Sequence, residues 1–528
     1  MNIKSNKILF INAGSEMLPI QAVTYHVLHK VFGFNNKIQF ITLNYKDFIV
    51  PNWISIKKTK SIFRRRLNLL RNNNKYAILY LFSLLVSLPL MLINTVNIVI
   101  MSIANKDDKV FFNAFLLNKI AGLRVSDCIL GILLRTEGSK GYLVRDQLFW
   151  GILIGFLYGF CVDYVFLRIL SLFYCGHKYF TLLDTIYFEE ALRRLFLKFK
   201  YTEIRYDNFM GKIVAMPPLT GSEINKKITI RNQYVPSEND LIKAKEKIEA
   251  LVYRKDTYDY MRGGDVDMTI KLDLEAIEKL FRKKTAVIFL HQVSDGQYCF
   301  GVDCFTDLHD WLVSTLSLLC KYDINVIIKM HPAYFNSNID YAVDKEYIRV
   351  VEDLLGVSFE QNNQAYLMPT KISNTHIIHH SFSTVALCEL FPDLLCITHH
   401  GTVAIEAAYL GANVLVSSAS PYISGIDTFV GIYSTIDEYA NYIFEWFNSA
   451  RKVNIKEDIS LLAYVSFYYF HIKYDDSVLE IGKAIGLDYS QETNSSYYTK
   501  LFTVLEDVDI EDKLYNDIEL VIEKFVYQ

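Results

Sequence analysis

The segment "NVIIKMHPAYF", residues 325–335, joins a run of aliphatic residues to a histidine and a proline. The run "NVII" predicts a buried strand, because β-branched side chains fit a pleated, covered surface. Pro332 ends this strand, since proline has no backbone N–H and favours an extended conformation in the residue before it. The sequence therefore predicts that His331 lies at the end of a strand, at a sheet edge where its ring can meet a ligand.

Two more buried strands of the C-terminal half also run into polar loops. "TAVIFLHQVSDGQYCFG" (285–301) is one, and "LLCITHHGTVAIEAAYLGANVLVSS" (394–418) reads as strand, loop, helix and strand. In doubly wound sheets, ligands bind beyond the carboxyl ends of the strands. We therefore expect His291–Asp295, His331 and His399–Thr402 to lie along one edge of a sheet.

A predicted helix lies between the first two of these strands in the sequence. Residues 307–322 form a predicted helix whose buried face repeats at helical spacing. That face consists of Leu308, Trp311, Leu312, Thr315, Leu316 and Leu319.

The N-terminal half also alternates strands and helices. "KILFIN" (7–12) and "KIQFITLN" (37–44) are predicted buried strands with a helix between them. Later, 122–138 predicts a turn and a helix, and 177–200 a strand and a helix, followed by the strand "TEIRYD". Such alternation is typical of parallel sheets covered by helices on both faces.

A chain of 528 residues is too long for one ordinary core. We predict an α/β protein with two doubly wound, Rossmann-like domains. The N-terminal domain would span 1–215, a helical linker 216–280, the C-terminal domain 281–445, and C-terminal helices 446–528.

Composition excludes some functions. The 55 basic and 58 acidic residues nearly balance, which gives no reason to expect a nucleic-acid partner. The eight cysteines show no CxxC spacing and fit a reduced interior. The opening "MNIKSNKILFINAG" predicts a core strand and not a signal peptide, so a cytoplasmic location is expected.

One apolar run complicates this location. Residues 76–105 carry no charge, and eight basic residues stand between positions 57 and 75. A single membrane crossing would separate the first strand from the strands that follow. Because Pro89 divides the run into halves too short to span, we predict a helical hairpin. It would either dip into the inner leaflet at the inner face of the cytoplasmic membrane or pack against the N-terminal domain. A second apolar stretch, 148–162, is predicted as a core helix.

The polar residues at the strand ends fit a phosphate ligand. His331 can donate to a phosphate oxygen and, as imidazolium, can stabilise a nucleotide leaving group. Gly401 allows close backbone approach at a helix N-terminus, where Thr402 can donate to a phosphate. Glu406, one turn later, can accept from ribose or sugar hydroxyls. The alternatives are a turn histidine, a helix-capping Thr402 and an exposed Glu406.

Metal binding is not expected. His379–His380 and His399–His400 are adjacent pairs, and neighbouring residues of a strand face opposite sides, so neither pair forms a chelate by itself. A zinc site would need further ligands that the spacing does not supply.

Taken together, "IFLHQVSDGQYCFG", "DLHDWLVSTL", "VIIKMHP" and "ITHHGTVAIEAAYLGANVLVSSASPY" resemble bacterial capsule and lipopolysaccharide biosynthesis glycosyltransferases of the GT-B type. The HP dipeptide is similar to that of capsular Kdo and sialic acid transferases. The G-T-x-x-x-E-A helix is similar to the nucleotide-binding helix of GT-B enzymes and of sugar 2-epimerases. The resemblance covers about residues 285–425, is weaker over 105–215, and does not extend to 430–528.

This resemblance implies roles for individual residues. His331 would contact the nucleotide phosphate, Gly401 and Thr402 would line the phosphate pocket, and Glu406 would hold the ribose. Asp295 would be the general base for an acceptor hydroxyl, or else a loop-capping aspartate. This sequence departs from the "KPHP" motif of the family, because Met330 stands in place of its first proline.

The function implied is transfer of a sugar from a nucleotide-activated donor to a bacterial surface polysaccharide, capsule or O-antigen, or to its lipid carrier. No metal or other cofactor is expected, and peripheral membrane contact would bring the enzyme near its acceptor. The alternatives are a polyol-phosphate transferase of the teichoic acid type with a cytidine diphosphate donor, a nucleotide-sugar 2-epimerase, and a non-catalytic scaffold of capsule assembly.

Overall fold

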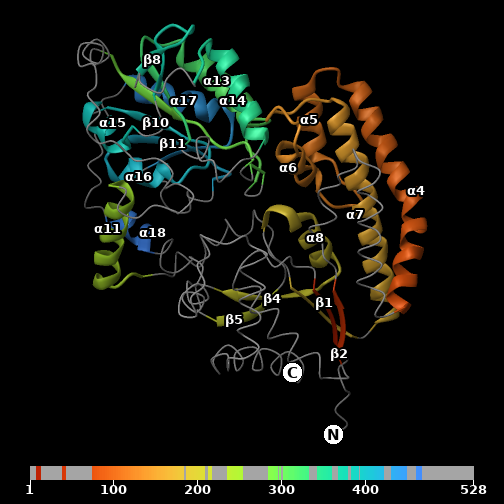
Figure 1. Cartoon of the computed structure of the whole chain (residues 1–528). Helices are drawn as coiled ribbons and strands as arrows, with labels where there is room; N and C mark the ends of the chain where they lie inside the picture. Colours follow the sequence, from red (N-terminus) through yellow and green to blue (C-terminus); the bar gives the residue numbers. More distant parts are fainter. Residues whose placement is uncertain are drawn as a thin grey trace. The chain divides into compact units, whose positions relative to one another are not determined.

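The structure is a computed structural model of the 528-residue chain (Figure 1). It describes residues 8–12, 38–42, 74–175, 177–182, 186–207, 212–216, 235–253, 283–294, 297–298, 301–331, 342–359, 367–378, 382–391, 393–420, 430–448 and 459–466.

The chain is an α/β protein that divides into two compact units. Leu133–Val144, which includes the last three residues of α6, and all described elements from α11 onward form the second unit. The remaining described residues form the first. The predicted linker 216–280 contains α11, whose residues Ala244 and Ile248 are fully buried in a core of the second unit. The segment 133–144, from within the predicted N-terminal domain, likewise belongs to the second unit.

The second unit contains a seven-stranded sheet in the order β12-β11-β10-β6-β7-β9-β8. Every pairing is parallel except that of β8 with β9. The strands are β6 (Thr285–Phe289), β7 (Asn325–Lys329), β8 (Leu367–Pro369), β9 (Thr375–Ile378), β10 (Leu395–Ile397), β11 (Asn413–Ser417) and β12 (Val430–Tyr433). The helices are α11 (Glu238–Val252), α13 (Leu308–Leu319), α14 (Ala342–Leu355), α15 (Thr384–Leu390), α16 (Val403–Tyr409), α17 (Ile436–Asn448) and α18 (Ile459–Ser466).

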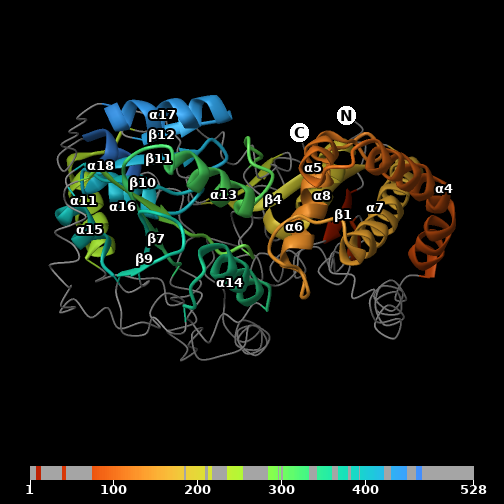
Figure 2. The same ribbon diagram turned by 90° about the horizontal axis from the view of Figure 1, so that it is seen from above.

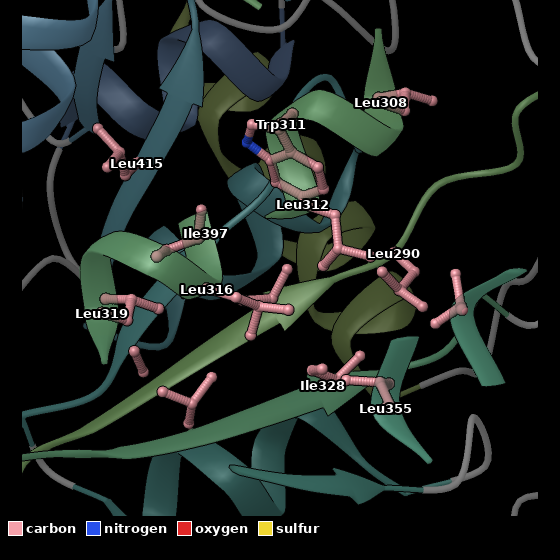
Figure 3. Close-up of a cluster of buried hydrophobic side chains, with 14 of the residues drawn as sticks. Leu290, Leu308, Trp311, Leu312, Leu316, Leu319, Ile328, Leu355, Ile397 and Leu415 are labelled. Carbon is pink, nitrogen blue, oxygen red and sulfur yellow. The ribbon is translucent and has the colours of Figure 1, made fainter. Parts of the chain in front are cut away.

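Helices cover both faces of this sheet. Along β6, Val287 and Phe289 pack in one core with α11, α15, α16 and α18, whereas Ala286 and Ile288 pack in another with α13, α14 and α17. This alternation follows from the strand period of two residues. All six residues predicted for the buried face of α13 are buried, and Figure 3 shows several of them beside the strands. The doubly wound arrangement predicted for this half is therefore confirmed.

The strand order reverses between β6 and β10. From β6 the chain winds outward through β7 and β9, and then returns to place β10 on the other side of β6. Ligands of open α/β sheets bind beyond the strand ends at such a reversal. The loops after β6 and β10 therefore define the edge at which a ligand site is expected.

The first unit contains a five-stranded sheet in the order β2-β1-β3-β4-β5, parallel except for β5. Its strands are β1 (Ile8–Asn12), β2 (Ile38–Thr42), β3 (Lys178–Leu182), β4 (Thr202–Asp207) and β5 (Lys212–Met216). Its helices are α4 (Asn74–Ala104), α5 (Asp108–Leu117), α6 (Ser126–Arg135), α7 (Gln147–Phe173) and α8 (Ile186–Lys198).

The predicted helical hairpin over 76–105 is wrong. The run forms one continuous helix, α4, with Pro89 inside it. An interior proline costs roughly 3 kcal/mol, because it lacks one donor and its ring clashes with the preceding turn. Packing along α7 (Figures 1 and 2) offsets that cost over much of the helix. Tyr80 meets the Phe166 ring edge-on at 5.5 Å, and the Tyr158 hydroxyl donates to the Leu84 carbonyl at 3.5 Å.

The second apolar stretch forms a mostly buried helix, as predicted. It continues past Asp163 and Arg168 as α7, and Asp163 is itself buried. Both α4 and α7 are long and apolar enough to cross a membrane, but only α4 leaves most of its apolar length exposed.

The burial pattern of α4 is inverted relative to that of a helix in a water-soluble protein. Its buried positions include Ser83, Ser87 and Asn94, which donate to carbonyls of their own helix. Its outward face is aliphatic and aromatic. The exposed residues are Ile78, Leu81, Phe82, Leu85, Val86, Leu88, Leu92, Ile93, Val96, Val99, Ile100 and Ile103. Small and polar residues inside with apolar residues outside is the pattern of helices that face lipid.

Candidate functional site

The polar strand ends of the second unit meet at the reversal of strand order. His291 follows β6, His331 follows β7, and the loop 398–402 follows β10. Because β6 lies between β7 and β10, these three segments are neighbours at the carboxyl edge of the sheet. Of the residues predicted for the site, the structure thus brings His331, Gly401 and Thr402 to one edge.

His291 holds the loop after β10. Its Nε2 accepts the His399 N–H at 2.9 Å and lies 2.9 Å from Thr398 Oγ1. The Thr398 hydroxyl also accepts the Gly401 N–H at 3.2 Å. The ring of His291 stacks on that of His400 at 4.4 Å. An imidazole nitrogen that accepts a backbone N–H carries no proton, so His291 is neutral with its proton on Nδ1.

Gly401 makes this close packing possible. A Cβ at this position would lie 2.8 Å from Thr398 Oγ1 and 3.1 Å from His291 Cε1. The sequence predicted that this glycine allows a ligand to approach the backbone. The structure shows that Thr398 and His291 of the protein itself also require the absence of a Cβ there.

Gly401→Ala is expected to destabilise the second unit by about 1–3 kcal/mol, because the added methyl forces Thr398 and His291 apart. Chemical denaturation measures this change. Gly151→Ala is the matched control, since a Cβ there meets nothing within 4 Å and alanine favours α7 over glycine. Equal effects of the two substitutions would contradict this account of Gly401.

A chain of hydrogen bonds runs from Asp303 to His400. Asp303 Oδ2 lies 2.9 Å from His399 Nε2, and His399 Nδ1 lies 2.9 Å from His400 Nδ1. Asp303 Oδ2 also accepts a hydrogen bond from the Ser417 hydroxyl, and Asp303 Oδ1 accepts one from the Phe305 N–H at 2.9 Å. The side chains of His399 and Asp303 are only 3% and 2% exposed, and His400 is buried.

The charges of this cluster follow from burial and pairing. Burial raises the pKa of Asp303, but His399 and the hydrogen bonds from Ser417 and Phe305 outweigh it, so the net pKa is lowered. Burial and the neighbouring histidines lower the pKa of His291 and His400 well below 6.5. The cluster therefore combines an ionised carboxylate at Asp303 with neutral imidazoles at His291 and His400.

His331 belongs to the same electrostatic cluster. Its charge contributes to lowering the pKa of both His291 and His400. Burial and the neighbouring Lys329 lower the pKa of His331 itself to about 4. The ring is partly exposed, whereas Lys329 is buried. His331 is thus neutral near pH 7.

The helix after the loop begins at Val403. Thr402 adopts helical angles, and its hydroxyl makes no capping hydrogen bond, so the predicted alternative of a helix cap is not observed. Within the described part of the chain, the N–H groups of Thr402 and Val403 donate to no protein group. Glu406 is half-buried one turn into α16.

Asp295, the predicted general base, lies outside the described residues. The ends of its loop are well anchored. The Ser294 hydroxyl and N–H donate to the Asp344 carboxylate at 2.5 and 3.1 Å, and Gln297 Oε1 accepts the Leu308 N–H at 3.1 Å. His379–His380 also lie outside the described residues.

Sequence reasoning missed part of this cluster. Asp303 and Ser417 received no role. His399–His400 were expected at the sheet edge and were weighed as metal ligands, but not as hydrogen-bond partners of each other or of Asp303. The rings of His399 and His400 meet because both residues lie in the bend after β10 and not within the strand. The available signal was a pair of histidines between a buried strand and Gly401.

The comparisons with known proteins give no family. No family profile and no curated protein matches the chain. Among solved structures, the UDP-GlcNAc 2-epimerase of Methanocaldococcus jannaschii, in complex with UDP-GlcNAc and UDP, is 10% identical and has a TM-score of 0.26. The match covers 86% of this chain and 97% of that one.

The MnaA protein of S. aureus, in complex with UDP, is 11% identical over 94% of this chain and 98% of that one, with a TM-score of 0.24. The N-terminal domain of Candida albicans trehalose-6-phosphate phosphatase is 12% identical, with a TM-score of 0.22. Its match covers 96% of this chain and 97% of that one. The first two proteins bind UDP. With TM-scores this low, none of the matches carries a conclusion about this chain.

Proposed function

We propose that the protein is a glycosyltransferase. It would move a sugar from a nucleotide-activated donor to a bacterial surface polysaccharide, capsule or O-antigen, or to its lipid carrier. The observation that carries the proposal is the contact between the loops after β6 and β10 at the reversal of strand order, with His331 beside it. A doubly wound sheet binds nucleotides at this kind of edge.

In this proposal the donor phosphates lie between His331 and the start of α16. The N–H groups of Thr402 and Val403, together with the Thr402 hydroxyl, supply donors. Glu406, on the same helix, accepts from the ribose. Hydrogen bonds to the departing diphosphate lower the barrier, because they strengthen as negative charge develops there. Asp295 remains the proposed base for the acceptor hydroxyl.

The decisive experiment is nucleotide binding. We expect one of UDP, CDP and GDP to stabilise the protein by about 2.7 kcal/mol at a hundredfold excess over its Kd, measured as a rise in Tm. His331→Gln is expected to weaken this binding. His376→Gln, near the amino end of β9 and therefore away from the carboxyl edge of the sheet, is expected to leave it unchanged. A protein that binds none of the three nucleotides would overturn the proposal.

Turnover separates the alternatives. Release of diphosphate from a sugar donor in the presence of acceptor supports glycosyl transfer, whereas consumption of a CDP-polyol supports a polyol-phosphate transferase. Conversion of a UDP-sugar to its 2-epimer without an acceptor supports an epimerase. A protein that binds nucleotide but turns over no donor, and whose His331→Gln variant still supports polysaccharide assembly in cells, would be a scaffold.

We also propose that the outward face of α4 lies on the inner leaflet of the cytoplasmic membrane, where a lipid-linked acceptor is found. A crossing by α4 or α7 alone would place β1 and β3 on opposite sides, although they pair as neighbouring strands. A crossing by both helices would remove the segment between them from α8. That segment is bonded to α8, because Arg194 pairs with Asp127 at 2.6 Å and Lys198 donates to the Ala121 carbonyl at 2.7 Å. A helix that lies on the membrane surface is compatible with all of these contacts.

A further inference from the structure

His400, in the loop after β10 at the proposed phosphate edge, has one polar side-chain atom without a partner in the part of the chain that the structure describes. Its Nε2 is buried and has no hydrogen-bond partner among the described residues. The residue itself is 6% exposed. A buried polar atom without a partner costs free energy, so it calls for an explanation such as a ligand.

The protonation of the three linked groups follows from their bonds. The Asp303 carboxylate is ionised and can only accept, so the 2.9 Å contact places a proton on His399 Nε2. The two Nδ1 atoms of His399 and His400 lie 2.9 Å apart, so one of them must donate. With both rings neutral, His399 Nδ1 accepts and His400 Nδ1 donates. His400 Nε2 then carries a bare lone pair.

A bare lone pair repels a phosphate oxygen, whereas an N–H⁺ attracts it. A proton added at His400 Nε2 would convert this atom into a donor. The resulting charge would be shared along the chain, because a shift of the Nδ1 proton from His400 to His399 leaves an imidazolium directly beside the Asp303 carboxylate. Asp303 thus makes a positive charge at this edge tolerable in spite of burial.

Other groups oppose that charge while no ligand is bound. His291 from the β6 loop stacks on His400, and His331 with Lys329 approaches from the end of β7. The carboxylate of Asp303, from the loop before α13, favours the charged form of His400. A diphosphate with its negative charges would reverse the balance.

We propose that binding of a nucleoside diphosphate at this edge is coupled to uptake of a proton by the His399–His400 pair. The proton comes from solvent and forms the His400 Nε2–H bond, and no bond of the nucleotide breaks. During sugar transfer the same His400 N–H⁺ would continue to donate a hydrogen bond to the departing diphosphate. This inference rests on the proposed function. Asp303 and His399 act as positioning residues, and His400 touches the ligand.

Calorimetric titration in buffers with different ionisation enthalpies measures the proton directly. The full-length protein is titrated at about pH 7.5, where the free histidines are neutral, with whichever of UDP, CDP and GDP raises its Tm most. The observed enthalpy plotted against buffer ionisation enthalpy is expected to have a slope of about one proton taken up per nucleotide.

Substitutions identify the residue that takes up this proton. His400→Gln is expected to bind with little proton uptake, and Asp303→Asn to lower both uptake and affinity, because the charge then has no carboxylate beside it. His376→Gln is the control and should keep the wild-type slope. If Asp303→Asn does not fold, nitrogen-15 NMR of the wild-type protein provides the second readout, in which His400 should change from an Nδ1–H tautomer to an imidazolium on nucleotide binding.

The outcomes separate the two proposals. Nucleotide binding with a slope of zero, or with a slope that His400→Gln leaves unchanged, would overturn the proton coupling and leave the nucleotide site standing. Absence of binding by all three nucleotides would remove the proposed function, and the coupling with it.

Discussion

The second unit is expected to lose stability steeply as the pH falls below about 6.5, well before most carboxylates titrate. At least three of its histidines have a lowered pKa, namely His291, His400 and His331. Burial is the largest cause in each; neighbouring histidines add to it for His291 and His400, and Lys329 adds to it for His331. Each contributes about 1.4 kcal/mol of lost stability per pH unit within its window, so together they remove about 4 kcal/mol per unit. That is a large share of the stability of an ordinary domain.

The direction follows from proton binding in the two states. Unfolded histidines take up protons near pH 6.5, whereas the folded rings stay neutral to lower pH, in the case of His331 to about 4. The unfolded state therefore binds more protons within this window, and acid favours it. Asp303 acts in a lower window. Since its folded pKa is depressed, its contribution is complete above about pH 3.8 and is lost only as the pH falls through the folded pKa.

Hydrogen exchange of peptides from β6 and β10, followed in urea at several pH values, measures this loss in the second unit alone. His400→Gln is expected to lower the pH slope, because the variant takes up one proton fewer on unfolding. His177→Gln, in the first unit, should leave the slope unchanged. A free energy of unfolding that stays flat between about pH 7.5 and about pH 5.5 would contradict neutral, buried imidazoles in this cluster.

Much of the fold follows from local patterns in the sequence. The helix α13 was predictable because its apolar residues repeat at helical spacing, and β6, β7 and β10 because short aliphatic runs end at polar loops. The common edge was predictable because parallel strands place their carboxyl ends together. The continuity of α4 was not, because the cost of Pro89 is local whereas the packing against α7 that offsets it comes from residues far along the chain.

The cluster at the candidate site was only partly predictable. His331 and Gly401 stand in short motifs, so their place could be inferred from the sequence. Asp303 stands in a loop with no regular pattern, and its role depends on contacts with His399 and Ser417, which are about a hundred residues away in sequence. Long-range pairing of this kind leaves no periodic signal. A sequence pattern can therefore locate the edge of a sheet, but it does not show which side chains there form hydrogen bonds or which of their atoms carry protons.

Charges placed on the outward face of α4 are expected to release the protein from anionic membranes. The face extends along a helix of about 46 Å and includes Leu85, Ile93 and Ile100, which are 70%, 60% and 59% exposed. Burying one such side chain contributes about 1.5–3 kcal/mol, so replacing all three with glutamate is expected to weaken vesicle binding by about 1,000-fold or more.

Two features of the chain favour an anionic bilayer as the partner of this face. Residues 48–106 contain no acidic residue, and eight basic residues precede the apolar part of α4. Basic residues are attracted to anionic headgroups, each by about 1 kcal/mol near the surface. The inward polar side chains of Ser83, Ser87 and Asn94 donate hydrogen bonds to carbonyls of their own helix. The surface that α4 exposes therefore consists of its outward apolar side chains. A lipid phase accepts that face without any further protein partner.

Cosedimentation with vesicles of phosphatidylglycerol and phosphatidylethanolamine tests this expectation on the full-length protein. The matched controls are Ile242→Glu on α11 and Phe444→Glu on α17, which add a charge at similarly exposed apolar positions of the second unit. High salt should weaken the binding of the wild-type protein without abolishing it, because the apolar contribution is not screened. If the triple variant binds vesicles as the wild-type protein does, α4 does not meet the lipid. If the wild-type protein instead forms a lipid-independent dimer that the triple variant breaks, the face serves a second copy of the chain, because a protein interface and not a bilayer then covers these side chains.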